Sequence, residues 1–285
     1  MNLRIIERPF NRSGLAALSD LETPEWKELF EYLEKEQNLF LKNEDQFRSP
    51  EYIWPRDPLH TWSRVWEYPY TYYHLKKKRK KLEGNLPRVV DLGSGVTFFP
   101  FSVAKLGYGV TCVDTDPICQ KDLLKAVELI DCKPGVVDFK ISDGKFLSFK
   151  DEEVDIVYCI SVLEHIPHLD KTIQEIARIL KTGGLFLLTI DLDLRGDSEI
   201  GVKSYKKLNN TLQNYFNYLY PETMIHPADM LHSESGPYGY KKLKGLSLVW
   251  FVIKQNIIKP ILGKRPRIFN TPFHLTVKGF VLRKK

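Results

Sequence analysis

The sequence is poor in cysteine, and its cysteines follow no recognisable pairing or metal-binding pattern. It contains Cys112, Cys119, Cys132 and Cys159, with no Cys-x-x-Cys spacing and no histidine placed to complete a zinc motif. A disulfide scaffold and a structural zinc site are therefore not expected. Unpaired thiols are typical of proteins in reducing compartments, so the sequence predicts a soluble, cytoplasmic protein.

Long apolar runs and a strong charge imbalance are also lacking. The longest apolar run, Leu248 to Ile253, is too short to span a bilayer, and the opening MNLRIIERPF has no apolar core of a secretion signal. The 42 basic and 36 acidic residues give a formal net charge of +6, which suits an acidic ligand without requiring one. With 43% hydrophobic residues and no internal repeat, the 285 residues have the composition of a globular protein.

The middle of the chain alternates short apolar segments with amphipathic ones. The apolar segments are predicted strands at Arg88–Leu92, Gly109–Asp114, Val136–Ser142, Val154–Ser161 and Leu185–Asp191. Between them we predict a helix after Gly95, a helix capped by Asp116, and a helix that ends at the Gly183-Gly184 pair. Strands that alternate with helices form a parallel sheet covered on both faces, so we expect a doubly wound α/β fold.

The first 86 residues precede this alternation. Thr23 followed by Pro24 is typical of a helix start, and apolar residues follow at helical spacing. The segment 51–75 is rich in aromatic residues, and its prolines argue against one continuous helix. We predict that residues 1–86 form a helical and aromatic-rich extension that caps the substrate as a lid.

Residues 87–285 are predicted to form the main domain. An insertion on the substrate side is expected around 192–272, where the periodicity is less regular. The last segment, Phe273–Leu282, alternates apolar and polar positions through Val277. It therefore indicates a closing strand, which we expect to be antiparallel to the others.

A glycine turn follows the first predicted strand, in the sequence VVDLGSGVT at 89–97. Gly93 and Gly95 lack a Cβ, so the turn can be tight and a ligand can approach the backbone N–H groups at the start of the next helix. Thr97 stands where dinucleotide-binding turns carry a third glycine, which argues against a pyrophosphate cofactor. Taken alone, the turn is compatible with either a ligand site or a purely structural loop.

Carboxylates follow the next two predicted strands. Asp114 ends the second strand, 19 residues after Gly95, where a carboxylate can accept both hydroxyls of a ribose. A helix cap is the alternative role, but Asp116 already fills it. Asp143 follows the third strand and can accept a hydrogen bond from an adenine amino group. Because Asp143-Gly144 is also a common turn pair, a structural role for Asp143 stays open.

The fourth predicted strand runs into a polar tip formed by Ser161, Glu164 and His165. Ligands of open parallel sheets bind outside the carboxyl ends of the strands, so these side chains are predicted to lie at the site. Histidine titrates near neutral pH, which makes His165 the first candidate for a catalytic base, with Glu164 second. The alternative is that this pair binds cofactor or orients a loop.

Five segments, in this order, resemble the class I S-adenosylmethionine-dependent methyltransferase superfamily. They are DLGSG with Asp91 at its start, VDTDP (113–117), SDGKFLSF (142–149), DIVYCISVLEHI (155–166) and LKTGGLFLLTIDL (180–192). The resemblance implies a Rossmann-like, seven-stranded, mostly parallel sheet whose last strand is antiparallel. It also implies S-adenosyl-L-methionine as the cofactor.

The resemblance assigns candidate residues to cofactor and acceptor. The cofactor set is Asp91, Gly93, Ser94, Gly95, Asp114, Thr115, Asp143, Gly144, Ser161 and Arg64, the last of which would pair with the methionine carboxylate. Acceptor contacts are expected from the loop after the fifth strand and from the aromatic segment, with the candidates Asp191, Asp193, Tyr68 and Tyr72. The predicted reaction is in-line transfer of a methyl group to a nitrogen or oxygen of a small-molecule acceptor, without a metal ion.

Other interpretations stay open beside this one. The basic run Lys76–Lys81 suits a nucleic-acid methyltransferase, but the sequence contains no base-flipping tetrad and no RNA-binding module, so a nucleic-acid partner is not expected. The basic and apolar segment 241–267 suits a membrane surface or a lipid or glycan acceptor, although a core strand and helix is the favoured interpretation. His226, Asp229 and His232 have a spacing that suits a metal, but the proline among them favours a loop.

Overall fold

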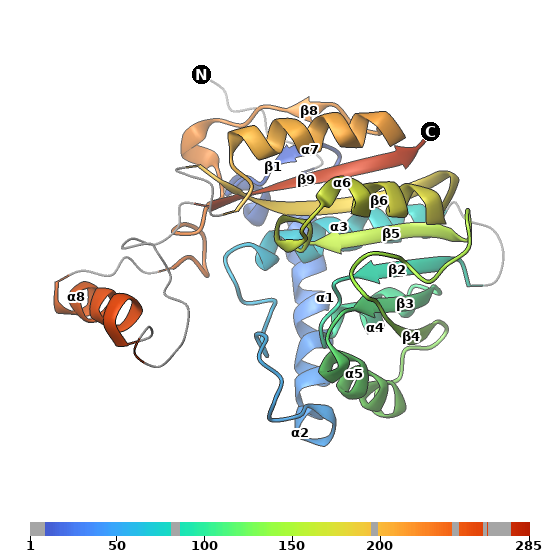
Figure 1. Cartoon of the computed structure of the whole chain (residues 1–285), viewed down its shortest axis with the longest axis horizontal. Coiled ribbons are helices and arrows are strands. Elements are labelled where there is room, and N and C mark those ends of the chain that lie inside the picture. Colours follow the sequence, from blue (N-terminus) through green and yellow to red (C-terminus); the bar gives the residue numbers. More distant parts are fainter. Residues whose placement is uncertain (1–8, 81–85, 195–198, 241–244, 259–260, 262–274) are drawn as a thin grey trace.

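The computed structural model describes residues 9–80, 86–194, 199–240, 245–258, 261 and 275–285 of the chain (Figure 1). These residues build a nine-stranded sheet with the order β4-β3-β2-β5-β6-β9-β1-β8, and β7 also pairs with β9. The strands are β1 Ser13–Leu15, β2 Arg88–Leu92, β3 Gly109–Asp114, β4 Val136–Ile141, β5 Val154–Ile160, β6 Leu180–Asp193, β7 Phe216–Tyr218, β8 Glu222–Thr223 and β9 Leu275–Lys284. Strands β2 to β6 are parallel, and β9 is antiparallel to β6.

Helices cover both faces of the sheet. The helices are α1 Pro24–Leu41, α2 Glu44–Phe47, α3 Arg64–Arg79, α4 Phe99–Ala104, α5 Pro117–Leu129, α6 Leu169–Ile179, α7 Val202–Tyr215 and α8 Leu246–Ile253. Apolar side chains of α1, α3, α4 and α5 form one core with one face of the sheet, and those of α6 and α7 form a second core with the other face. Successive side chains of β5 point to opposite faces of the sheet, so this strand contributes to both cores, with Tyr158 in the first and Val157 in the second.

The predicted doubly wound α/β class and the antiparallel last strand are confirmed. The bounds of β2 and β3 agree with those expected. The sheet has more strands than the seven predicted because β1, from the N-terminal extension, and β8 extend the edge beyond β9. The short strand β7 pairs with the end of β9 in antiparallel orientation.

One predicted helix end was wrong. Helix α6 ends at Ile179, and the chain is already in strand β6 from Leu180 through the glycine pair. Leu180 pairs with Val154, and the register then shifts before Ile156 pairs with Leu185. The glycines therefore mark a bulge in β6 rather than the end of the helix.

Helix α3 begins only at Arg64, so the prediction that the segment 51–75 is not one continuous helix is confirmed, but α3 itself continues through Pro69. A proline cannot donate a hydrogen bond to the carbonyl four residues earlier, which here is that of Val65. The indole N–H of Trp26 in α1 donates to this carbonyl at 2.8 Å. A side chain from a second helix thus satisfies the group that proline leaves unpaired.

Helix α3 lies directly against strand β9 at Gly279. A Cβ at this position would lie 2.6 Å from a ring carbon of Tyr70 and 2.9 Å from a ring carbon of Trp66. These two rings are stacked with centroids 4.4 Å apart. The absence of a side chain at Gly279 therefore allows the aromatic residues of α3 to pack on the sheet.

A buried ion pair anchors β1 beneath α3. Arg12 donates to both carboxylate oxygens of Asp20, at 2.9 Å and 2.5 Å, and both side chains are buried. The indole N–H of Trp66 adds a third bond to Asp20 at 2.8 Å. Part of the predicted lid, residues 1–86, is therefore built into the main sheet.

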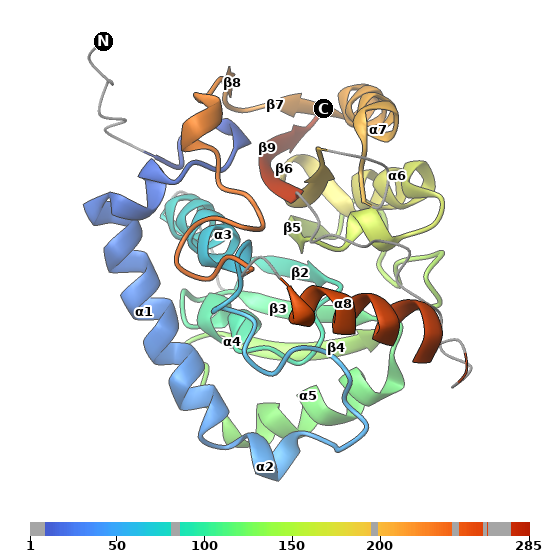
Figure 2. The same cartoon turned by 90° about the vertical axis from the view of Figure 1, so that its left-hand side faces the viewer.

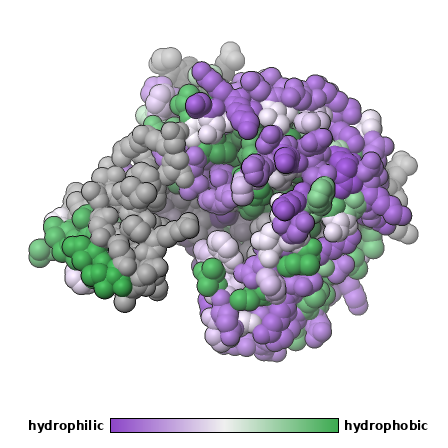
Figure 3. Space-filling model, viewed as in Figure 1, coloured by the Kyte–Doolittle hydropathy of each residue, from purple (hydrophilic) through white to green (hydrophobic). Residues whose placement is uncertain are grey.

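The segment of α8 is not the core strand and helix that we favoured from the sequence. Leu246, Val249 and Trp250 expose 88%, 53% and 59% of their surface. Helix α8 stands away from the layers of the fold in Figure 1, and Figure 3 shows an apolar surface at its position. The remainder of the predicted segment lies largely outside the described residues. Within the described part of the chain, no helix has the length and apolar character needed to cross a membrane.

Candidate active site

The candidate site lies at the edge of the sheet where the parallel strands β2, β3, β5 and β6 have their carboxyl ends. The turn after β2 contains two glycines with positive φ, +76° at Gly93 and +54° at Gly95. A Cβ at Gly93 would lie 2.5 Å from two side-chain carbons of Val162, and one at Gly95 would lie 3.2 Å from the Tyr52 hydroxyl. Both positions therefore favour glycine, because of backbone conformation and because of close neighbours.

Asp114 connects this turn to the end of β3. Its carboxylate accepts hydrogen bonds from the backbone N–H groups of Gly95 at 3.0 Å, Thr115 at 2.7 Å and Asp116 at 3.2 Å. A carboxylate offers about four acceptor positions, so roughly one remains available to a ligand. The geometry thus accommodates one ribose hydroxyl at Asp114 more readily than the two expected from the sequence.

Asp143 lies in an exposed turn and holds that turn together. Its carboxylate accepts hydrogen bonds from the N–H groups of Lys145 at 2.8 Å and Phe146 at 3.0 Å, which lower the pKa of Asp143. Gly144 has a φ of +76°, and a Cβ there would lie 3.6 Å from the Thr115 methyl group. The turn therefore sits beside the end of β3, while the adenine contact of Asp143 stays a prediction.

Asp91 and Ser94 are both buried at the start of the glycine turn. Burial raises the pKa of Asp91 to about 8, so its carboxyl group is largely protonated at neutral pH. The Ser94 hydroxyl donates to the Gly95 carbonyl at 3.2 Å. Tyr68 of α3 is buried over this region and stacks on Phe99, with ring centroids 4.6 Å apart.

Three acidic side chains from three different elements meet beyond Ser161, and we call Glu67, Glu164 and Asp191 the carboxylate cluster. The Ser161 hydroxyl donates to Glu67 at 2.6 Å and lies 3.4 Å from an Asp191 oxygen. Glu164 accepts from the backbone N–H of Asp191 at 3.1 Å. Arg64 forms an ion pair with Glu67, so one cation faces three carboxylates.

Desolvation perturbs the titration of two members of the cluster, Glu164 and Asp191. Burial raises the pKa of Glu164 to about 8, with a further contribution from Glu67 that Arg64 opposes. Burial also raises the pKa of Asp191 well above its usual range, and the charges of Glu67 and Glu164 act in the same direction. Glu164 and Asp191 therefore favour their protonated forms at neutral pH and can exchange protons with a bound molecule.

His165 lies outside the carboxylate cluster, of which Glu67 is buried and Glu164 and Asp191 are half-buried. Its side chain is 61% exposed, and its Nδ1 is 3.4 Å from Glu199. Glu164, one residue earlier, lines a pocket of about 350 Å³ together with His168, Asp170, Glu199, Ile200 and Lys207. Of the two predicted bases, Glu164 is the one that the structure brings into contact with other predicted site residues.

The remaining predicted acceptor residues lie in different surroundings. Tyr72 is buried between helices, with its ring 5.3 Å from that of Tyr32 in α1 and 6.4 Å from that of Phe99. Asp193 is buried at the end of β6, where its backbone N–H donates to the Ile200 carbonyl at 3.0 Å. Tyr72 is not brought into the carboxylate cluster, and its role in binding the acceptor stays a prediction.

Sequence reasoning missed two residues that shape the site. Glu67 was noted only as part of the aromatic segment, although its position three residues after Arg64 on a helix suits an ion pair. The Tyr52 hydroxyl accepts the N–H of Val96 at 3.1 Å, and the Arg48 guanidinium stacks on the Tyr52 ring at 4.6 Å. No local sequence pattern predicts the contact between Tyr52 and the glycine turn.

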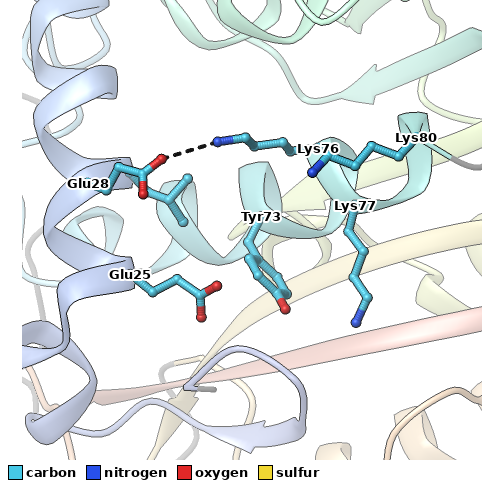
Figure 4. A pocket seen from close by; sticks show the side chains of 7 residues that line it. Glu25, Glu28, Tyr73, Lys76, Lys77 and Lys80 are labelled. Atoms are coloured by element: carbon cyan, nitrogen blue, oxygen red, sulfur yellow. Dashed lines mark hydrogen bonds and ion pairs between the residues drawn. The ribbon is translucent and has the colours of Figure 1, made fainter. Parts of the chain in front are cut away.

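The basic run at Lys76–Lys81 is remote from these residues. Lys76, Lys77 and Lys80 line a cavity of about 290 Å³ between α1 and α3, and Lys76 lies 3.4 Å from Glu28 (Figure 4). Arg64 and Lys76 are separated by roughly 18 Å along the helix, at 1.5 Å per residue. The basic last turn of α3, which complements the helix dipole, consists of Lys76, Lys77, Lys78 and Arg79 from this run. These four residues do not border the candidate site, and Lys81 lies outside the described residues.

The segment with His226, Asp229 and His232 forms a short turn instead of a metal-binding helix. A 3-10 helix spans Pro227–Asp229. The Asp229 carboxylate accepts from the backbone N–H of Ser19 at 2.9 Å and from its hydroxyl at 2.6 Å. Among the residues that the structure describes, no three His, Cys, Asp or Glu side chains are grouped to hold a metal ion.

Residues 90–188 match a family model described as a methyltransferase domain. Over 140 residues, the chain is 33% identical to a ubiquinone biosynthesis O-methyltransferase of Xanthomonas axonopodis pv. citri, which covers 48% of this chain and 54% of the relative. Over 119 residues, it is 31% identical to an uncharacterized methyltransferase of Mycobacterium tuberculosis, covering 41% and 45%. The chain thus spans about half the length of the curated relatives that it matches.

The fold also resembles solved structures. The crystal structure of the cyclase SpnF aligns with a TM-score of 0.50 at 14% identity, over 96% of this chain and 99% of that one. At this level of identity the likeness concerns the fold alone. Because a cyclase has this fold, the fold by itself does not determine the reaction, which depends on the residues of the site.

Proposed function

We propose that the chain transfers a methyl group from S-adenosyl-L-methionine to an oxygen or nitrogen of a small-molecule acceptor, as the match of residues 90–188 to a methyltransferase domain and the identity to O-methyltransferases support. The observation that carries this proposal is the direct bond between the glycine turn and Asp114. This bond holds a carboxylate that can accept a ribose hydroxyl beside the backbone N–H groups of the glycine turn. The O-methyltransferases among the relatives make oxygen the first acceptor atom to test.

The residues at the carboxyl ends fit this cofactor. Asp114 has roughly one acceptor position free for a ribose hydroxyl, and the turn carrying Gly144 lies beside Thr115, where an adenine would follow the ribose. A bound S-adenosyl-L-methionine supplies an electrophilic methyl group on a positively charged sulfur. The acidic surroundings of Asp191 and Glu164 suit that charge, whereas Arg64 is engaged by Glu67 and is a weaker candidate for the methionine carboxylate.

Within this proposal the chain contributes alignment and proton transfer. Tyr68 and Phe99 form an apolar wall that excludes water near the turn. Because the pKa of Glu164 is about 8, most of this carboxyl is protonated at neutral pH; its ionised minority form is the stronger base for that reason, and we propose that this form accepts the proton of an acceptor hydroxyl as the methyl group is transferred. Ser161 and the backbone N–H of Asp191 hold the cluster in position. We therefore rank Glu164 ahead of His165, which reverses the order expected from the sequence.

Calorimetric titration with S-adenosyl-L-methionine and S-adenosylhomocysteine tests the cofactor assignment without knowledge of the acceptor. Asp114→Asn removes a charged acceptor, and a hydrogen bond to a charged group contributes about 1.5–3 kcal/mol. Affinity should fall by about tenfold or more. Asp116→Asn is the matched control, because asparagine also caps a helix and the Asp116 side chain accepts the N–H of Ile118 in the first turn of α5. Binding of neither compound to the wild-type protein, or equal losses in both variants, would contradict the assignment.

A further inference from the structure

The exposed helix α8 is the largest apolar feature that the proposed function leaves unused. Exposed fractions are 88% for Leu246, 53% for Val249 and 59% for Trp250. The π-helical turn Lys254–Ile258 continues it, and Ile257 is 54% exposed. Surface apolar residues are normally scattered, so a contiguous exposed group of this kind marks an interaction site.

The charge around α8 restricts what can cover it. The segment 241–267 contains eight Lys and Arg residues and no Asp or Glu, and no acidic residue follows Glu234 in the sequence. An isologous dimer would place two such segments face to face, where like charges repel. Short apolar stretches with tryptophan and flanking lysines are instead typical of segments that lie in the interface of an anionic membrane.

The length of α8 suits lying in an interface. Its eight residues extend roughly 12 Å, whereas the hydrocarbon core of a bilayer is about 30 Å thick. An apolar side chain such as Trp250 needs to enter only the boundary between headgroups and acyl chains. Lysine side chains at the helix end, such as Lys254, can keep their charge among the headgroups while their methylene groups lie along the apolar layer.

Other exposed apolar side chains lie at the same edge of the sheet as the candidate site. Ile53 and Trp54, 79% and 52% exposed, directly follow Tyr52, whose hydroxyl contacts the glycine turn. Phe146, 67% exposed, follows the carboxyl end of β4, and Leu194, 45% exposed, follows that of β6. In Figure 1 the arrowheads of β2 and β5 point toward the side where α8 stands, and Figure 2 looks onto that side.

We propose that this face docks on an anionic lipid surface through α8, which places the carboxyl-end edge of the sheet against the membrane. The exposed apolar residues of α8 enter the interface, and the positive charge of Lys254 at the end of this helix attracts negatively charged headgroups. The acceptor that such an orientation favours is an amphiphile presented from the membrane. Docking itself does not depend on the proposed methyl transfer, because it requires neither cofactor nor acceptor.

Co-sedimentation of the full-length protein with vesicles tests this proposal. Vesicles of phosphatidylcholine alone are compared with vesicles in which roughly one lipid in three is phosphatidylglycerol. The protein should bind the anionic vesicles at least about tenfold more strongly, and raising the ionic strength to about 1 M should weaken that binding. Binding to neither vesicle type would overturn the proposal.

A pair of valine variants distinguishes docking through α8 from nonspecific adsorption to vesicles. Val249→Asp places a charge on α8 and should weaken vesicle binding by at least about tenfold. Val136→Asp is the matched control, because Val136 is 51% exposed and begins β4 at the opposite edge of the sheet. Circular dichroism checks that both variants are folded. Equal losses in the two variants would refute docking through α8, as would a stable dimer that Val249→Asp dissociates, since a second copy would then cover the helix.

Discussion

Replacing Glu164 by glutamine should flatten the dependence of stability on pH between about pH 5 and pH 8. In the unfolded chain this carboxyl has its ordinary pKa of 4.5, whereas burial raises its pKa to about 8 in the folded protein. A raised pKa means that the folded state prefers the protonated form. Its stabilising contribution is complete below pH 4.5 and is lost as the pH rises through 8. Glutamine has no proton to lose and shows no such change.

The size of the effect follows from the interval between the two pKa values. Each pH unit between them costs about 1.4 kcal/mol of unfolding free energy, which amounts to at most about 5 kcal/mol from pH 4.5 to pH 8. The charges of Glu164 and Asp191 interact, so the two carboxyl groups titrate together. The change of unfolding free energy with pH given above therefore belongs to the first proton that the pair loses. Asp91, whose pKa is also about 8, is present in both proteins and cancels in the comparison.

Urea unfolding of both proteins at half-unit pH steps measures this difference. Glu175→Gln is the control, because hydrogen bonds from Arg178 lower the pKa of Glu175 and its carboxylate is ionised in both folded and unfolded states above about pH 5. That variant should lose stability by the same amount at every pH from 5 to 8. If the wild-type and Glu164→Gln curves stay parallel across this range, folding does not raise the pKa of Glu164, and the increased basicity on which its role as proton acceptor rests is absent.

Two further substitutions test the packing of α3 by the same urea measurement. Gly279→Ala should destabilise the protein by about 1–3 kcal/mol, because the added Cβ would lie less than 3.0 Å from the rings of Tyr70 and Trp66. Gly109→Ala is the control and should change stability by less than about 1 kcal/mol, because the nearest neighbours of its Cβ lie at 3.8 Å. Similar losses of stability in the two variants would contradict the packing of α3 against Gly279. Trp26→Phe should cost about 1–3 kcal/mol, because the Val65 carbonyl loses the indole N–H that donates to it in place of Pro69. An unchanged midpoint would show that water replaces the indole.

Features with a local physical cause could be predicted from the sequence. The Thr23 hydroxyl accepts the N–H of Trp26 at 3.2 Å, and Asp116 accepts that of Ile118 at 2.8 Å, so both predicted helix starts are confirmed. The strands between them were recognisable because their residues are apolar on both faces, as expected for strands buried in a parallel sheet. In each case the residues that decide the structure are close together in the chain.

Features that depend on a distant partner could not be predicted in this way. Pro69 remains inside α3 because Trp26, in another helix, satisfies the freed carbonyl. The apolar pattern around Trp250 is equally compatible with a core helix and an exposed one, since hydrophobicity does not reveal whether a partner surface exists. The same limit applies to the site, where Glu67 reaches Ser161 across 94 positions of the chain.

The position of β9 also determines the order in which the sheet can be completed. During synthesis β6 emerges long before β9, the strand that pairs along its outer edge, so β6 presents an unpaired apolar edge in the meantime. Strand β1 remains unpaired with β9 for even longer during synthesis, because the Val281 N–H that donates to the Ser13 hydroxyl lies 268 positions later in the chain. Once β9 inserts between β6 and β1, both edges are paired in one late step. A ribosome stalled before β9 would therefore hold a chain that is prone to aggregate through the unpaired edge of β6.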